Sequence, residues 1–196
     1  MSETLSTMMA LGTTAPGFSL PDAVSGRTIT PETFRGGKAL FIAFTCNHCP
    51  YANVGEAELG KIGRQYGSQG VGMVAISSND VGQYPEDGPA GMREMAKRAG
   101  FTFPYCHDET QETAKAYGAA CTPDYFLFDG SLRLVYRGQL DDARPGNGKA
   151  SDGKHLRAAL DALLAGRPVP PEQRPSLGCN IKWKPGNAPA YVSIKR

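Results

Sequence analysis

The sequence has neither a long hydrophobic run nor a cluster of like charges. Charged residues, glycines and prolines interrupt every apolar stretch of the 196-residue chain well before the roughly 18 residues that a membrane span needs. The net charge is only +2, and the lysines and arginines are scattered along the chain. These absences argue against a membrane protein, and against a nucleic acid or an anionic membrane surface as partner.

The N-terminal segment lacks the features of a secretory leader. "MSETLSTMMALGTTAPGF" has no basic residue, carries an acidic one at Glu3, and has only a short apolar run from Met8 to Leu11. A secretory signal combines a positively charged start with an apolar run of roughly 7 to 15 residues. We therefore expect a cytoplasmic protein. The segment "GNGK" is too short for a phosphate-binding loop, and no cofactor is expected.

Cysteine occurs five times, as Cys46, Cys49, Cys106, Cys121 and Cys179. A chain of this length can bury a sizeable core and does not need a framework of disulfides to fold. The stretch "TCNHCPY" forms a Cys-x-x-Cys motif with His48 in the spacer and Pro50 directly after it. Redox chemistry or metal binding is therefore expected of these thiols.

The Cys-x-x-Cys motif lies between a predicted strand and a predicted helix. Residues 39–45, "ALFIAFT", form the apolar run of a strand buried on both faces, and apolar residues recur at helical spacing over 51–66. Unpaired N–H groups and the helix dipole favour an anion in the first turn. We therefore expect Cys46 to be a reactive thiolate with a pKa of roughly 3.5 to 7.5, and the more buried Cys49 to resolve a mixed disulfide.

His48 adds a group that can carry positive charge beside the Cys46 thiolate. Stabilising the reduced form of a dithiol makes its disulfide more oxidising. The spacer therefore predicts a stronger oxidant than a Gly-Pro spacer would give.

Strands and helices alternate through the rest of the chain. Short extended pieces at 18–30 suggest a hairpin, and a second buried strand is expected at 71–77. Helices are expected at 90–99, at about 108–117, and from a cap at 151 or 152 to 165. Residues 124–138 should form an antiparallel hairpin with Asp129-Gly130 as its turn. This alternation predicts an α/β fold, in which residues 12–166 form one domain with a central mixed sheet flanked by helices.

Residues 167–196 are rich in proline and form a C-terminal extension. Cys179, Ile181 and the single tryptophan, Trp183, favour packing of this tail on the domain, because such residues are seldom left in water.

The order of these motifs resembles the redoxin branch of the thioredoxin-like fold, which includes alkyl hydroperoxide reductases and thiol-specific antioxidants. The resemblance is carried by "GTTAPGFSL", "GRTITPETFRGGKALFIAFTCNHCP" and "FPYCHDETQETAKAYGAACTPDYFLFDGSLRLVYRG" and covers roughly residues 12–165. The tail "LGCNIKWKPGNAP" is similar to that of uncharacterised bacterial thioredoxin-like proteins with the same "CNHCPY". The resemblance implies a three-layer sandwich with an N-terminal hairpin and a Pro-rich C-terminal tail.

The resemblance also implies roles for individual residues. Cys46 would be the attacking cysteine, Cys49 the resolving one, and Pro123 the cis-proline beside them. The backbone of Thr122 would pair with a peptide substrate as an added strand, with Asn47 as a further substrate contact.

The sequence departs from the related families at two places. Leu40 stands where thioredoxins carry a buried acid, so proton handling would fall to His48, Asp124 or water. Peroxiredoxins share a Pro-x-x-x-Thr-x-x-Cys pattern whose threonine position is occupied here by Cys46. The neighbouring Thr45 is one residue out of register, and no upstream proline fits, which disfavours efficient peroxide reduction.

The preferred hypothesis is a thiol-disulfide oxidoreductase that acts on protein thiols and disulfides and exchanges electrons with a reducing or oxidising partner protein. One alternative is a thiol peroxidase that acts on peroxides. Another is a redox-sensing or metal-binding module, although a single Cys-x-x-Cys, with Cys106 and His107 adjacent, does not supply the usual zinc ligand pairs.

Two further cysteines are candidates for auxiliary thiols. Cys121 stands two residues before Pro123 and could instead be a small buried residue. Cys179 could be a resolving cysteine that the tail brings to the site.

Overall fold

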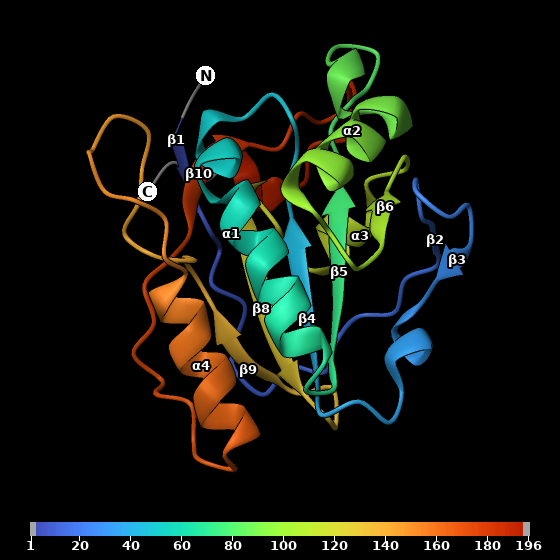
Figure 1. The fold of residues 1–196 in the computed structure, drawn as a ribbon. Helices are drawn as coiled ribbons and strands as arrows, with labels where there is room; N and C mark the ends of the chain where they lie inside the picture. Colours follow the sequence, from blue (N-terminus) through green and yellow to red (C-terminus); the bar gives the residue numbers. More distant parts are fainter. Residues whose placement is uncertain (1–2, 194–196) are drawn as a thin grey trace.

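A five-stranded mixed sheet forms the centre of the computed structural model, which describes residues 3–193 (Figure 1). Its strands, in the order β6-β5-β4-β8-β9 across the sheet, are β6 (Tyr105–His107), β5 (Val71–Ser77), β4 (Ala39–Phe44), β8 (Asp124–Asp129) and β9 (Leu134–Arg137). β4, β5 and β6 run parallel, whereas β8 is antiparallel to both β4 and β9. The predicted mixed sheet is confirmed.

Helices cover both faces of this sheet. Figure 1 shows α1 (Pro50–Gly67) and α4 (Lys154–Leu164) over one face, with α2 (Pro89–Ala99) beside them and α3 (Glu112–Ala116) behind the sheet. Successive side chains of β4 enter opposite cores: Phe41 packs with the residues of α1 and α4, and Ile42 with those of α3. Because both faces are buried, the strand reads as a continuous apolar run rather than an alternating one.

The C-terminal extension takes part in a second, smaller sheet. β10 (Leu177–Asn180) lies between β1 (Glu3–Leu5) and β7 (Cys121–Thr122), antiparallel to both. Beyond β10, Ile181 is buried in the core under α3, and Trp183 packs against the same core. The tail thus lies against the domain directly beside the predicted cis-proline.

Short elements complete the fold. β2 (Leu20–Pro21) and β3 (Thr28–Ile29) form the N-terminal hairpin, and single 3-10 turns occur as η1 (Pro31–Phe34), η2 (Pro85–Asp87) and η3 (Ala190–Ser193). None of the helices within residues 3–193 is long and apolar enough to cross a membrane.

Two predicted elements differ from the structure for local reasons. The third helix is shorter than expected because the buried carboxylate of Asp108 accepts the N–H groups of Thr113 and Ala114, and Gln111 ahead of the helix has a φ of 66°. The predicted two-residue turn at Asp129-Gly130 is also wrong. The Asp129 carboxylate accepts the N–H groups of Ser131 and Arg133, which makes a longer loop, and β9 begins only at Leu134.

Two glycines of α1 provide a test of the helix packing. A Cβ added to Gly60 would lie 1.9 Å from the carbonyl oxygen of Ala99 at the end of α2, whereas one added to Gly67 would meet no heavy atom within 4 Å. We expect Gly60→Ala to destabilise the protein by about 1–3 kcal/mol because the helices must separate. Gly67→Ala should be neutral or stabilising by up to about 1 kcal/mol. Urea unfolding measures both, and equal effects of the two substitutions would contradict the packing described.

Candidate active site

Cys49, and not Cys46, lies at the start of α1. The strand β4 ends at Phe44 and the helix begins at Pro50, so Cys49 is the N-cap residue and Cys46 stands three residues ahead of it. Pro50 occupies the first helical position, where its missing N–H costs no hydrogen bond. Both cysteines are fully buried.

The fold brings Thr122 and Pro123 to the cysteine pair. The Thr122-Pro123 peptide bond is cis, which confirms the prediction for Pro123. The Thr122 hydroxyl lies 3.2 Å from the Cys46 sulfur, and the Thr122 carbonyl accepts a hydrogen bond from the Cys49 thiol at 2.9 Å. One residue therefore contacts both sulfurs of the motif.

The environment of Cys49 favours a thiolate. Neighbouring donor groups, first the Cys46 thiol and then Cys179 and Ala52, lower the pKa of Cys49 to about 5, against the opposing effect of burial. The hydrogen bond to the Thr122 carbonyl acts the other way, because only a protonated Cys49 can donate it. The helix dipole acts in the same direction at an N-cap.

The direction of the pKa shift at Cys46 runs against the predicted Cys46 thiolate. Burial raises the pKa of Cys46 well above that of a free thiol, and both its hydrogen bond to Cys49 and the nearby charge of Asp87 raise it further. The sequence argument placed Cys46 in the first turn, whereas the structure places it outside the helix. Of the two thiols, Cys49 therefore carries a negative charge more readily than Cys46 does.

Asp87, which the sequence analysis missed, organises the loop that carries His48. Its carboxylate is fully buried and accepts hydrogen bonds from the backbone N–H groups of Asn47 at 2.7 Å and His48 at 3.1 Å, from the Asn79 side chain at 2.9 Å, and from His48 Nδ1. Burial opposes the charge on this carboxylate, but the bonds from His48 and Asn79 lower the pKa of Asp87 nonetheless.

The pairing with Asp87 changes the role expected of His48. A carboxylate can only accept, so Nδ1 of His48 carries its hydrogen toward Asp87. The Cys46 sulfur lies 3.7 Å from the same nitrogen, and the ring of Tyr84 stacks on the imidazole with centroids 4.2 Å apart. Any positive charge on His48 thus faces a negative partner, and the predicted stabilisation of a Cys46 thiolate by His48 alone does not hold.

A sequence signal for Asp87 and Asn79 existed. Both belong to the polar segment "SSNDVGQYPEDGP" that follows β5, the parallel neighbour of β4. The carboxyl ends of adjacent parallel strands meet at one edge of a sheet, which is where ligands and catalytic groups gather in such folds.

Asn47 holds the motif loop to the Asp87 segment. Its side-chain amide donates to the carbonyl of Glu86 at 2.8 Å, and its carbonyl oxygen accepts from Arg98 at 3.5 Å. These contacts give Asn47 a structural role in the loop, and its contact with a substrate stays a prediction.

Three of these side chains form a group that could bind a metal ion. Ligand atoms of Cys46, His48 and Asp87 lie within 4.8 Å of one another. Two ligands of a tetrahedral zinc ion, each about 2.0–2.2 Å from the metal, would be more than about 3 Å apart. His48 and Asp87 are in direct hydrogen-bond contact instead, so a metal could enter only by separating them.

The backbone of Thr122 is not free to pair with a substrate strand. β10 is hydrogen-bonded along β7, with Cys179 opposite Thr122 and Asn180 opposite Cys121. The approach is close at Gly178, where an added Cβ would lie 2.0 Å from the Thr122 carbonyl oxygen. The expectation of an open pairing edge is therefore wrong, because the chain's own tail occupies it.

The two auxiliary cysteines differ in their surroundings. Burial raises the pKa of Cys121 well above that of a free thiol, and its thiol donates to the Pro123 carbonyl at 3.5 Å. Cys179 instead packs in one cluster with Cys46, Cys49 and Ala52. Cys121 therefore fits the role of a buried structural residue, and Cys179 is the thiol that the tail brings to the site.

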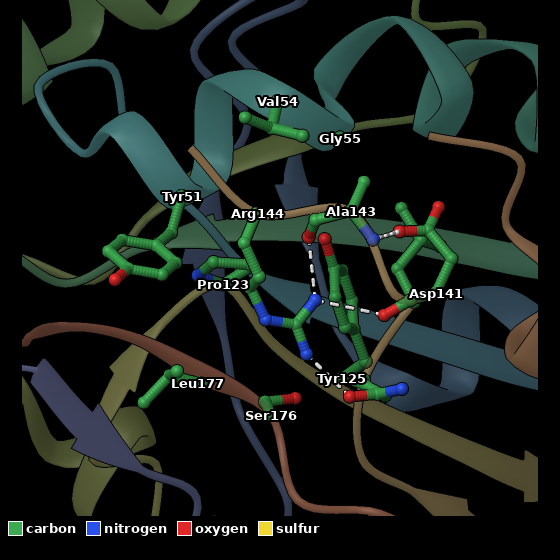
Figure 2. A pocket seen from close by; sticks show the side chains of 12 residues that line it. Tyr51, Val54, Gly55, Pro123, Tyr125, Asp141, Ala143, Arg144, Ser176 and Leu177 are labelled. Atoms are coloured by element: carbon green, nitrogen blue, oxygen red, sulfur yellow. Dashed lines mark hydrogen bonds between the residues drawn. The ribbon is translucent and has the colours of Figure 1, made fainter. Parts of the chain in front are cut away.

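A small hollow has Pro123 in its lining (Figure 2). It is bounded by the first turns of α1, by the loop after β9 and by the start of β10, and its lining includes Tyr51, Gly55, Pro123, Tyr125, Arg144 and Leu177. Figure 2 shows the guanidinium of Arg144 folded back onto its own loop, where it donates to the carbonyls of Asp141 and Ala143 at 2.9 and 2.6 Å. The loop after β9 is therefore a fixed wall of the hollow.

Asp124 follows Pro123 and is the buried acid nearest to it in the chain. Its side chain is fully buried, and one carboxylate oxygen accepts the N–H of Tyr125 at 3.2 Å. Burial raises the pKa of Asp124 to about 7. It can therefore hold a proton at neutral pH, as the proton-handling role expected of it requires.

A cysteine pair at the end of a central strand, with a cis-proline against it, defines a thioredoxin-like thiol protein. The Redoxin family model matches residues 10–154, and the chain belongs to this family. No curated protein matches the sequence.

Solved structures of two bacterial proteins resemble nearly the whole chain. An uncharacterized conserved protein from Geobacillus kaustophilus is 52% identical with a TM-score of 0.92, over 95% of this chain and 98% of its own. A hypothetical protein from Sinorhizobium meliloti 1021 is 49% identical with a TM-score of 0.91, over 93% and 100%. A putative thiol:disulfide interchange protein from Chlorobium tepidum shares the fold at 18% identity, with a TM-score of 0.62 over 79% of this chain and 98% of its own.

The charge on Cys49 can be tested by thiolate absorbance. We expect reduced protein to gain one thiolate with an apparent pKa near 5, because the Cys46 thiol and the other neighbouring donor groups lower the pKa of Cys49. Cys49→Ser should abolish that transition, and Cys46→Ser should shift it upward because one donor weakens. Cys106→Ser, a change in the distant core under α3, is the matched control. Loss of the transition in Cys46→Ser with retention in Cys49→Ser would reverse the assignment.

The buried Asp124 predicts a pH dependence of stability. Its pKa of about 7 in the folded protein exceeds its unfolded value, so the stability that it contributes is complete below about pH 4 and is lost as the pH rises through 7. A shift of about three units corresponds to about 4 kcal/mol. Asp124→Asn should therefore gain stability relative to wild type between pH 5 and pH 8 in urea unfolding. Parallel profiles of the two proteins would show that Asp124 does not titrate in this range.

Proposed function

We propose that this protein is a thiol-disulfide oxidoreductase that cycles Cys46 and Cys49 between dithiol and disulfide, with protein disulfides as substrates. The observation that carries the proposal is the buried Cys46–Cys49 pair at the end of β4, with Thr122 in contact with both sulfurs and the cis-Pro123 directly after it. Such a pair holds one thiolate and one proton at neutral pH, which are the two species that disulfide exchange consumes.

Cys46 is assigned as the attacking sulfur because it lies in the loop with Asn47 and His48, both partly exposed. Cys49 is enclosed by α1, β7 and β10. The Cys46 proton passes along the existing hydrogen bond to Cys49, and the Cys46 thiolate attacks the substrate disulfide. This step forms a mixed disulfide and releases one substrate thiolate.

Cys49 completes the reaction. It transfers its proton to the departing thiolate and attacks the Cys46 sulfur, which releases the second substrate sulfur as a thiolate. The products are the Cys46–Cys49 disulfide, one substrate thiol and one substrate thiolate, so two electrons and one proton have moved to the substrate. The reverse sequence oxidises a substrate dithiol, and a partner protein returns the couple to its starting state.

Access to the buried pair requires that part of the surrounding structure moves. The hollow at Pro123, with Tyr51, Tyr125 and Leu177 as apolar lining, offers a surface against which a substrate could dock. We assign this hollow to the substrate, because the pairing edge of Thr122 is occupied by β10.

A second candidate function, reduction of a peroxide, is favoured by the low pKa of Cys49. A thiolate can attack a peroxide oxygen, become a sulfenic acid and release an alkoxide or hydroxide. Cys46 would then condense with the sulfenic acid to give the same disulfide and water. Stopped-flow consumption of hydrogen peroxide no faster than by free cysteine would remove this candidate.

An insulin-reduction assay with dithiothreitol as electron source tests the proposed function. We expect wild type to accelerate insulin precipitation, Cys46→Ser and Cys49→Ser to show no acceleration, and Cys106→Ser to match wild type. All four proteins should have the same circular dichroism. Equal rates for wild type and Cys46→Ser would overturn the proposal.

A further inference from the structure

The tail strand β10 places a third thiol against the cysteine pair. Cys179 lies opposite Thr122 in the β10–β7 ladder, and Thr122 is the residue whose carbonyl contacts the Cys49 sulfur. Each of the side chains of Cys179 and Cys49 shifts the pKa of the other, as expected of thiols in close proximity. Both are buried in one cluster with Cys46.

Cys49 is the common neighbour of the two other thiols. It packs in one buried cluster with both of them, and each of them shifts its pKa. Within the described residues, Cys179 is not part of the group of potential metal ligands that Cys46 forms with His48 and Asp87. Disulfide exchange needs the attacking and the leaving sulfur on the same central sulfur atom, and Cys49 is placed to be that atom between Cys179 and Cys46.

We propose that Cys179 is a third redox-active cysteine, which attacks Cys49 in the Cys46–Cys49 disulfide and forms a Cys49–Cys179 disulfide. This inference rests on the proposed function, which supplies the first disulfide. The Cys179–Cys49 bond forms, the Cys46–Cys49 bond breaks, and the proton of Cys179 passes to the departing Cys46 thiolate. No electron is gained or lost, so the step needs no further oxidant.

The surroundings of Cys179 support this step. Burial raises the pKa of Cys179 to about 12, and its hydrogen bond to the charged Cys49 also raises it. Cys49 loses its charge when it enters a disulfide, so that second effect disappears in the state that Cys179 would attack. Lys182 acts in the opposite direction and favours ionisation.

The exchange would have two consequences for the site. Cys46 would be a free thiol again, able to meet a second substrate, while the oxidising equivalent is stored in the Cys49–Cys179 bond. That bond would also link the start of α1 covalently to β10, the strand that covers the Thr122 edge.

Peptide mapping of the Cys46→Ser variant tests the third thiol. After reaction with oxidised glutathione, Cys49 of this variant should form a mixed disulfide that Cys179 resolves, giving a peptide that joins positions 49 and 179 and free glutathione. The Cys46→Ser, Cys179→Ser variant should instead keep glutathione on Cys49. Adding Cys121→Ser to Cys46→Ser should leave the joined peptide unchanged, because Cys121 is equally buried but contacts Pro123.

Absence of the joined peptide in a folded Cys46→Ser protein would overturn the proposal. The same oxidation and peptide mapping of wild type distinguishes failure of this proposal from failure of the proposed function. A Cys46–Cys49 peptide in wild type without any 49–179 peptide in Cys46→Ser would leave the proposed function standing. No linked peptide in either protein would remove both.

Gly178→Ala provides a second test that keeps Cys49 and Cys179 in place. The added Cβ would lie 2.0 Å from the Thr122 carbonyl oxygen, so β10 must move away from β7. In the Cys46→Ser background this substitution should slow formation of the 49–179 disulfide. An unchanged rate would show that the β10–β7 pairing does not position Cys179 for the exchange.

Discussion

The chemistry of this site depends on Thr122, which contacts each of three cysteines through a different group. Its hydroxyl lies beside Cys46, its carbonyl oxygen lies 2.9 Å from the Cys49 sulfur, and its strand pairs with the strand of Cys179. The cis-Pro123 links this strand, β7, to the central strand β8. The three sulfurs, which come from the Cys-x-x-Cys motif and from the C-terminal tail, are therefore held around one short segment.

The second constraint is the point at which α1 begins. With Cys49 as its N-cap, the helix directs its dipole and the N–H of Ala52 at the second cysteine of the motif. On the other side of Cys46, Asp87 fixes His48 and contributes a negative charge. Both effects act in the same sense: they leave the proton on Cys46 and the charge on Cys49. A thiolate held in the dithiol and lost in the disulfide makes the couple more oxidising.

Much of the fold could be predicted from the sequence, because strands buried on both faces and helices with one apolar face leave clear patterns. The strand "VGMVAIS" and the helix that Pro50 begins are examples. The site was predicted less completely. That Cys46, Cys49 and Pro123 meet follows from the order of the motifs. Which of the two sulfurs is ionised depends on where α1 begins, and its N-cap is Cys49, three residues after Cys46. Asp87 and the pairing of Cys179 with Thr122 are long-range contacts, for which one sequence gives no register.

The pH dependence of the reduction potential tests the central claim most directly, that the dithiol keeps one thiolate on Cys49 at neutral pH. Each proton taken up with the two electrons changes the potential by about 30 mV per pH unit. Because Cys49 has a pKa of about 5 and Cys46 one well above that of a free thiol, reduction should take up a single proton between about pH 6 and pH 8. The account predicts a slope of about 30 mV per pH unit in this range, at a potential above the roughly −270 mV of a reducing thioredoxin. A slope of about 60 mV per pH unit would mean that both thiols are protonated, and would contradict it.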